Sequence, residues 1–467
     1  MAVFGEASLT EKQFENNHTH EYLPLGEISL GCGVSSRICL YCRGVRGFCG
    51  KSMCPVLVRV ESIFKHRDLI CSDHVEGTTP PALFVGRIGY PKVYVGPMIP
   101  PYHGDTEILD TPELWVGRSI LDIVDYRYSL VRGKVRFGVA DARNPPRLLE
   151  DLQELAMSKR PAEAEAIFSK RPRGLIILDD YVQPFGPSAP LKKFIVPNIS
   201  VDSRIERAFY DTDMKASEAI LSLYDAGVLV TRIQRAFSLG MFGTYSRRRL
   251  VPTRWAITAV DTSISSRIIE DIKKYPTIDE YYVYTFKNIG NLYAAIFIPE
   301  SWSFEWVEAW YPKTFWNYDG SAPELMGDYE NYGGRASYAS VGGCYYAARL
   351  AVAERLRGMR RQASCLVLRE IHPDYILPVG VWNVRESVRA MLKTEPVKFD
   401  TLHKAISHTL TFLTVPLKDW MRASVTLKIH HQQRKMIQYV GLLPSPVNYA
   451  NITSSKQSST VTYKLLP

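Results

Sequence analysis

The sequence predicts an α+β protein: a mixed α/β fold of two domains, with an N-terminal zinc knuckle formed by four cysteines. Short apolar runs broken by Gly and Pro indicate strands, and apolar stripes at helical spacing indicate helices. These segments do not alternate in the regular βαβ order of a doubly wound sheet. The 467 residues are enough for two or three domains with a sizeable core.

The knuckle is expected at residues 39–54, in the run CLYCRGVRGFCGKSMC. Cys39 and Cys42 form a C-x2-C pair, and Cys49 and Cys54 follow as C-x4-C. Four thiolates about 2.3 Å from the metal satisfy a tetrahedral zinc ion and leave no open position, which indicates a structural site. The alternatives are disulfides or free thiols. Cys32 is a second candidate for one ligand position, although a buried thiol is its simpler role.

The predicted N-terminal domain covers residues 31–311 and follows a polar, flexible arm at 1–30. A helix is expected at 111–130, with Thr111 as its N-cap and Pro112 in its first turn. The other expected elements are two short strands in 80–101, a helical stretch at 145–172, a buried strand at 175–178, a helix pair at 211–240, a strand within 247–262, hairpin strands at 281–286 and 292–299, and a helix at 303–311.

Residues 312–340 are rich in Gly, Asp, Asn and Tyr and have weak periodicity, which favours a linker or long loop before a smaller C-terminal domain at 341–442. Asn383 is expected to cap a helix in that domain, with Glu386 completing a capping box. Residues 443–467 are polar and Ser/Thr-rich, and are expected to be a disordered tail. The expected elements of the C-terminal domain are a helix at 343–361, a strand at 365–370 and a helix at 383–392.

Positive charge is concentrated near the C-terminus. The net charge of the chain is +9, and residues 418–467 hold seven Lys or Arg against one Asp. A concentrated basic segment attracts a polyanion such as DNA, so Lys428, Arg434 and Lys435 are candidate nucleic-acid ligands. The alternative is a solvated basic face that aids solubility.

The sequence also predicts a cytoplasmic protein without a membrane partner. No apolar run approaches the roughly 20 residues that cross a bilayer, and the first residues lack the basic-then-apolar layout of a signal peptide. Cysteines clustered in a short run fit a reducing compartment better than a secreted disulfide scaffold.

Several long blocks of the sequence stand out: the cysteine run ending in CP, LFVGRIGYPKVYVGP, LDDYVQPFGPSAPLKKF, LVPTRWAITAVDT, GGCYYAARLAVAERL and PVGVWNVRE. Together they resemble the archaeal Nre family of DNA repair proteins. The resemblance extends from about residue 30 to about residue 440. It implies an N-terminal domain with a four-cysteine zinc finger, a C-terminal domain and a role in the response to DNA damage. The zinc ligands it implies are Cys39, Cys42, Cys49 and Cys54, the same four that the spacing selects.

Members of this family often end in a peptide that binds the sliding clamp. The pattern is Gln, two spacers, an aliphatic residue, two spacers and two aromatics. Gln457 and Tyr463 match it, whereas Thr460 stands at the aliphatic position and Lys464 at the second aromatic position. Losing two apolar anchors weakens such an interface. The sliding clamp is therefore an expected partner through a degenerate motif, and a lost motif is the alternative.

Enzyme activity is left open by the sequence. Asp179 and Asp180 follow the expected strand at 175–178 and are candidate ligands of a divalent metal, as in nucleases, although Asp pairs at strand ends are commonly caps and turns. The predicted function is DNA repair through DNA binding, with recruitment by the clamp. The alternatives are a metal-dependent nuclease or other nucleic-acid processing enzyme using these two carboxylates, and a protein-interaction scaffold.

Overall fold

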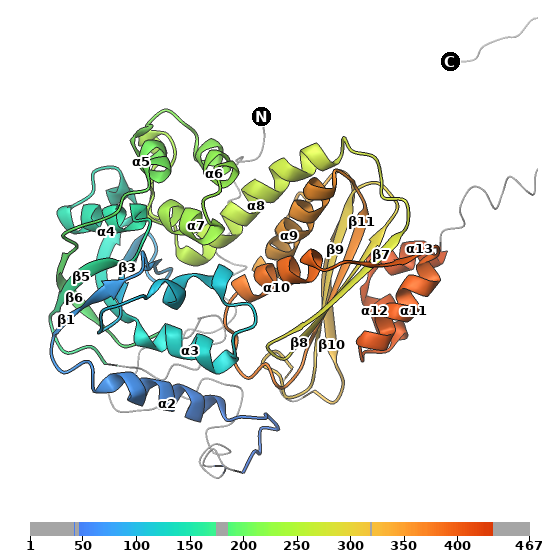
Figure 1. Ribbon diagram of the computed structural model, residues 1–467, viewed down its shortest axis with the longest axis horizontal. Helices are drawn as coiled ribbons and strands as arrows, with labels where there is room; N and C mark the ends of the chain where they lie inside the picture. Colours follow the sequence, from blue (N-terminus) through green and yellow to red (C-terminus); the bar gives the residue numbers. More distant parts are fainter. Residues whose placement is uncertain (1–41, 43–45, 174–184, 318–319, 433–467) are drawn as a thin grey trace, which may run out of the picture.

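Two six-stranded sheets joined by a central layer of helices form the protein (Figure 1). The computed structural model describes residue 42 and residues 46–173, 185–317 and 320–432. Both sheets mix parallel and antiparallel neighbours, so the predicted mixed α+β class is confirmed. In these described parts of the chain, no helix is long and apolar enough to cross a membrane.

The first sheet has the strand order β1-β5-β6-β4-β3-β2. Only one of its two faces is apolar throughout: in β5, Ala162, Ala164 and Ala166 are buried, whereas Glu163 and Glu165 between them point the other way. The apolar face packs on helices α4 (Arg147–Met157) and α7 (Val230–Ser238). The strands are β1 (His74–Thr79), β2 (Leu83–Val85), β3 (Lys92–Ile99), β4 (Val131–Gly138), β5 (Ala162–Phe168) and β6 (Ser188–Ile195).

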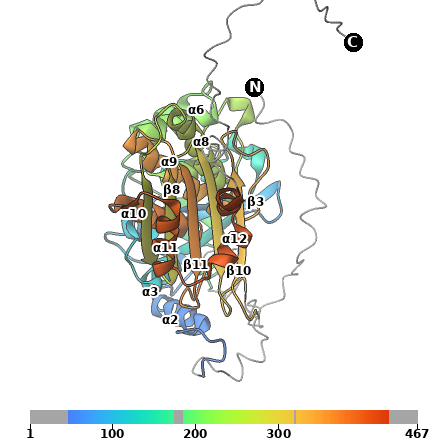
Figure 2. The same cartoon turned by 90° about the vertical axis from the view of Figure 1, so that its right-hand side faces the viewer.

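The second sheet has the order β10-β9-β11-β8-β7-β12, and both of its faces are covered. Helices α9 and α10 pack on one face, and α11, α12 and α13 cover the other, as Figure 2 shows for α11 and α12. The strands are β7 (Tyr281–Asn288), β8 (Asn291–Ile298), β9 (Ser303–Trp310), β10 (Glu324–Glu330), β11 (Ser364–Ile371) and β12 (Val397–Phe399). The helices are α9 (Gly343–Met359), α10 (Trp382–Lys393), α11 (Leu402–Phe412), α12 (Leu417–Ala423) and α13 (Val425–Gln432).

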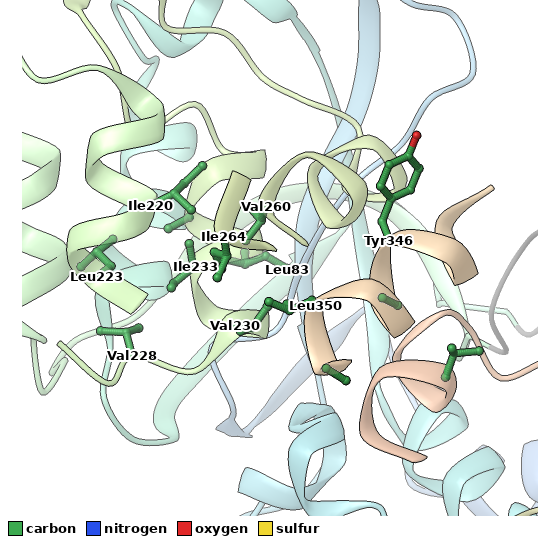
Figure 3. Close-up of a cluster of buried hydrophobic side chains, with 14 of the residues drawn as sticks. Leu83, Ile220, Leu223, Val228, Val230, Ile233, Val260, Ile264, Tyr346 and Leu350 are labelled. Atoms are coloured by element: carbon green, nitrogen blue, oxygen red, sulfur yellow. The ribbon is translucent and has the colours of Figure 1, made fainter. Parts of the chain in front are cut away.

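One continuous hydrophobic core joins the two sheets. It runs from Leu83 of β2 through Ile233 of α7 and Val260 of the long helix α8 (Thr253–Ile272) to Leu350 of α9 (Figure 3). Helix α6 (Ala216–Asp225) closes this core by packing on α7 and α8. The remaining helices are α2 (Pro55–Arg67), α3 (Ile120–Ser129) and α5 (Ser203–Tyr210). Because the core is shared, the position of the first sheet is fixed relative to the second.

Most of the expected helices and strands are confirmed. The strands in 80–101, the helix pair in 211–240, the hairpin at 281–299 and the three C-terminal elements all lie where the sequence predicts them. The helix expected at 111–130 starts later, at Ile120, because Ser119 and Asp122 form the capping box. Residues 112–114 form a short 3₁₀ turn instead. The stretch at 145–172 holds a helix only to Met157 and continues as β5.

Two elements have the opposite type from the prediction. The strand expected within 247–262 is the start of helix α8, and the helix expected at 303–311 is strand β9. All eight residues of β9 are buried, so its sequence lacks the alternation that identifies a half-exposed strand. The helix cap also differs: α10 starts at Trp382, and Asn383 donates a hydrogen bond to Tyr293 Oη at 3.2 Å instead of capping.

The range expected as a linker, 312–340, contains β10. This strand pairs with β9 along its whole length, from Glu324↔Trp310 to Glu330↔Phe304. The second sheet therefore takes β7, β8 and β9 from before this range, and β11 and β12 from after it.

Candidate nucleic-acid interface

Four of the residues that the sequence selects for function are described by the structure: Cys42, Cys49, Cys54 and Lys428. Lys428 is exposed on α13, at the opposite end of the molecule from the first sheet (Figure 1). Cys39, Asp179, Asp180, Arg434, Lys435, Gln457 and Tyr463 lie outside the described residues. The assignments of metal, nuclease, tail and clamp functions to those residues stay predictions.

The cysteine segment forms two tight turns before α2. Arg46 N–H donates to Cys42 O at 3.2 Å, and Gly50 N–H donates to Gly47 O at 2.8 Å. Both glycines have positive φ, +61° and +68°, which a residue with a side chain rarely adopts. Cys54 occupies the N-cap position of α2. These turns fit a compact zinc segment, although within the described residues, which exclude Cys39, no three His, Cys, Asp or Glu side chains are arranged around a common metal position.

Three distant segments of the chain meet at one edge of the first sheet: the β2–β3 turn, the end of β4 and the segment that leads into α8. Val139 N–H donates to Pro91 O at 2.9 Å, and Leu250 N–H donates to Val139 O at 2.8 Å. Val85 N–H donates to Thr253 Oγ1, in the first turn of α8, at 2.8 Å. These hydrogen bonds hold the three segments in one continuous surface.

This surface is strongly basic. Residues 77–104, 131–140 and 242–260, which supply it, hold nine Lys or Arg and no Asp or Glu. Of the nine, Arg248 is buried and donates to the backbone oxygens of Gly243 and Phe209, so its role is structural. The basic–aromatic surface, as we call it, consists of Arg87, Ile88, Tyr90, Lys92, Tyr94, Lys134, Arg136, Arg247, Arg249, Arg254 and Trp255.

Aromatic rings are exposed among these charges. Tyr90 and Trp255 are each 48% exposed, and their ring centroids lie 5.3 Å apart. Tyr94 is 42% exposed, with the Arg136 guanidinium 6.0 Å from its ring centroid. Grouped exposed apolar side chains indicate a binding surface. Aromatic rings beside positive charge are typical of proteins that stack unpaired bases.

Gly89 allows the β2–β3 turn to lie against β4. Its φ is +83°, and a Cβ atom there would lie 2.9 Å from Lys92 O and 3.1 Å from Arg136 Nη2. A larger residue would therefore strain the turn and displace the Arg136 side chain.

Arg132, Lys134 and Arg136 alternate along β4 and so share one face of the first sheet. The Arg132 guanidinium lies 4.3 Å from the ring centroid of Phe84 and 4.1 Å from that of Phe185. Burial, and next the positive charge of Arg132, lower the pKa of Lys134 to about 8. The row thus runs from an arginine enclosed by aromatic rings to an exposed arginine, with a half-buried lysine between them.

Sequence reasoning missed this surface. A local signal was present, because the run RGKVRFG at 132–138 alternates basic and small or apolar residues at the period of a strand. The position of that run beside β3 and the β2–β3 turn, whose Tyr90 contacts Trp255, depends on the tertiary fold.

The buried ion pair of the second sheet, Glu308 and Arg369, has all its partners inside the fold. Glu308 accepts hydrogen bonds from Trp306 Nε1 at 2.9 Å and from Trp310 Nε1 at 3.0 Å, and Arg369 Nη1 lies 3.2 Å from its Oε1. Arg369 Nε also donates to Asn291 Oδ1 at 3.0 Å. Both members of the ion pair are 3% exposed, so a ligand in solvent does not reach them.

Comparison with known proteins gives two family matches along the chain. The model described as archaeal Nre, N-terminal, matches residues 48–317, and the model described as archaeal Nre, C-terminal, matches residues 330–439. The chain belongs to the archaeal Nre family. The gap between the two Nre matches falls in the expected linker range, whereas the second sheet takes strands from both matched parts.

The Nre relatives cover most of the chain. DNA repair protein NreB of Archaeoglobus fulgidus is 42% identical over 397 residues, which is 85% of this chain and 98% of the relative. DNA repair protein NreA of the same organism is 37% identical, covering 82% of this chain and 95% of the relative. DNA repair protein NreA of Haloferax volcanii is 34% identical, covering 77% and 88%. No solved structure matches the chain.

Proposed function

We propose that this protein acts in DNA repair and binds DNA through the basic–aromatic surface. The charge of that surface supports the proposal, because the three segments that build it hold nine Lys or Arg and no Asp or Glu. A phosphate backbone is attracted to such a surface whatever its base sequence. The exposed rings of Tyr90, Tyr94 and Trp255 add stacking area for bases. The relatives named above are DNA repair proteins.

The test is the salt dependence of DNA binding, measured by fluorescence anisotropy with labelled single-stranded and double-stranded oligonucleotides. Binding through several phosphates weakens steeply with salt. Replacing both Arg87 and Arg136 by alanine should weaken binding to all sequences alike and reduce the salt slope by about 2. Arg361, exposed just beyond α9, provides the control Arg361→Ala, which should behave as the unmodified protein. An unchanged slope in the double variant, or no binding at low salt, would contradict the proposal.

We also propose that Cys39, Cys42, Cys49 and Cys54 hold one structural zinc ion. Bound there, zinc would fix a segment too small to bury a core of its own. The positive φ angles of Gly47 and Gly50 and the position of Cys54 at the start of α2 support the assignment.

Metal analysis of the purified protein should give about one zinc per chain, in line with a single four-thiolate site. The double variant Cys49→Ser, Cys54→Ser should lose the metal, whereas Cys71→Ser, which changes an exposed cysteine outside the run, should keep it. Zinc retained in the double variant would place the metal elsewhere.

For the tail, we propose that residues 457–463 contact the sliding clamp. Gln457 and Tyr463 provide the two matching positions of the motif. In a pull-down or surface plasmon resonance assay with the clamp, Tyr463→Ala should abolish binding, because it removes the single aromatic anchor. Ser455→Ala, just before the motif, is the control. Clamp binding that survives deletion of residues 456–467 would show that the contact lies in another part of the chain.

A further inference from the structure

Lys134 occupies the middle of the basic row on β4, at the boundary between its buried and exposed parts. Arg136 on one side is exposed, whereas Arg132 on the other is enclosed by aromatic rings. Continuing the register of Val95↔Val135 places Gly96 of β3 opposite Lys134. Since glycine has no side chain, β3 places nothing over the lysine side chain at this position.

The neighbouring strand β6 places no polar side chain opposite Lys134. Pro190 pairs with Lys134 and is exposed, and proline has no polar side chain that could bind the amine. No described residue forms a hydrogen bond or an ion pair with Lys134 Nζ. Its half-burial therefore has no compensating partner among the described residues.

Among the described residues of β3, β4 and β6, the charged or titratable groups within two positions of Lys134 in the strand register are Arg132 and Arg136 on β4, Tyr94 on β3 and Lys192 on β6. None of these four is a carboxylate, so none stabilises the ammonium form. With its pKa at about 8, Lys134 is about half neutral at pH 8, whereas a lysine of ordinary pKa is less than about 1% neutral there. The neutral amine is the nucleophilic form.

We propose that Lys134 is a nucleophile that forms a covalent imine with the aldehyde of an abasic site in DNA. The inference rests on the proposed DNA binding by the basic–aromatic surface, to which Lys134 belongs. An abasic site is the form of DNA in which the ring-opened deoxyribose presents an aldehyde carbon to an amine. Its missing base also leaves a gap that an aromatic ring can fill, and Tyr94 is exposed on the same face as Lys134.

The reaction is an addition followed by loss of water. The lone pair of neutral Lys134 Nζ forms a bond to C1′, the electron pair of the carbonyl π bond moves to the aldehyde oxygen, and that oxygen takes up a proton as Nζ loses one. The carbinolamine then expels its oxygen as water while the nitrogen lone pair forms the C=N bond and Nζ loses its second proton. Amine and aldehyde give imine and water, so no oxidant or reductant takes part.

The imine is detected by reduction with sodium borohydride, which converts it into a stable secondary amine. The probe is a labelled single-stranded oligonucleotide with one abasic site, and the cross-link is a slow-migrating band on a denaturing gel. The full-length protein should give the cross-link, and the same oligonucleotide without the abasic site should give none. The yield should rise as pH increases from about 6.5 to about 8, because the neutral fraction of the Lys134 amine rises.

Lys134→Arg is the decisive variant, because arginine keeps the positive charge but does not form the imine. Because it keeps the charge it should still bind the abasic oligonucleotide, and it should lose at least about nine-tenths of the cross-link. Lys192→Arg changes an exposed lysine of β6 that lies outside the basic–aromatic surface, and it should keep the full yield.

The outcomes separate the two proposals. Cross-linking that persists in Lys134→Arg would assign the reaction to another amine and overturn the inference. Binding of abasic DNA without any cross-link in the unmodified protein would overturn it too, while leaving the proposed DNA binding intact. Absence of DNA binding at low salt would overturn both.

Discussion

The two sheets of this protein differ in where their charged side chains lie and in whether those side chains have partners inside the fold. The second sheet, covered by helices on both faces, buries Glu305, Glu308, Arg369 and Glu370 and gives every one of them hydrogen-bond partners. The first sheet exposes part of one face, where Arg136 and Lys92 lie in chain segments that hold no acidic residue.

The carboxylates on the outer face of the second sheet secure the helices that cover it. Glu305 accepts hydrogen bonds from Val425 N–H at 2.6 Å and Thr426 N–H at 2.8 Å, at the start of α13. Glu370 accepts one from Val415 N–H at 2.7 Å, just before α12. Charges with internal partners stabilise the fold, whereas charges that face solvent without counterparts are available to a ligand. The comparison therefore assigns stability to the second sheet and binding to the first.

The largest expected effect is a loss of stability when the ion pair of the second sheet, Glu308 and Arg369, is broken. Glu308→Gln keeps the shape of the side chain but leaves the Arg369 guanidinium buried without a counter-charge, which should lower the free energy of unfolding by about 3–5 kcal/mol. The change in the free energy of unfolding is measured by denaturant titration monitored by circular dichroism. The matched control is Glu165→Gln on β5, where the carboxylate is 38% exposed beside His74, and there the change should stay within about 0.5 kcal/mol. Equal losses in both variants would remove the contrast between the sheets.

An intermediate effect is expected from the aromatic part of the first-sheet surface. Trp255→Ala removes an exposed ring that contacts Tyr90 and should reduce the free energy of binding to single-stranded DNA by about 1–3 kcal/mol. The stability of the Trp255→Ala variant should change little, because the Trp255 side chain is 48% exposed. Fluorescence anisotropy and thermal unfolding of the same sample measure the two quantities. The exposed ring of Tyr210 on α5 provides the control Tyr210→Ala. A loss of stability without a loss of affinity would show that Trp255 is a packing residue.

How far the sequence predicts this structure depends on burial. Helices with one apolar stripe, such as α10 with Val384, Val388 and Met391 buried, were predicted because their period is visible. Strand β9 is buried on both faces and α8 is rich in β-branched residues, so local pattern and propensity gave the wrong type, and tertiary packing decided it.

The candidate site could likewise be predicted from the sequence only in part. The alternation of Arg132, Lys134 and Arg136 is visible in the sequence, but its value as a surface comes from the neighbouring β2–β3 turn, whose Tyr90 contacts Trp255 of α8. The hydrogen bond between β2 and α8 joins Val85 and Thr253, which are 168 positions apart. The cysteine run and the basic C-terminal segment were found because all their members lie close together in the sequence.

The smallest expected effect on DNA binding is that of replacing Lys428, the basic residue of the C-terminal candidate set that the structure describes. Lys428 is exposed on α13, which covers the second sheet at the far end of the molecule from the first sheet (Figure 1). Exposed charges separated by more than the Debye length, about 10 Å at 0.1 M salt, are largely screened from each other. Lys428→Ala should therefore leave the salt slope of DNA binding unchanged for a short oligonucleotide that covers only the first-sheet surface. A salt slope reduced by about 1 in Lys428→Ala would mean that DNA contacts both ends of the molecule. Helix α13, which covers the second sheet, would then also belong to the DNA-binding surface.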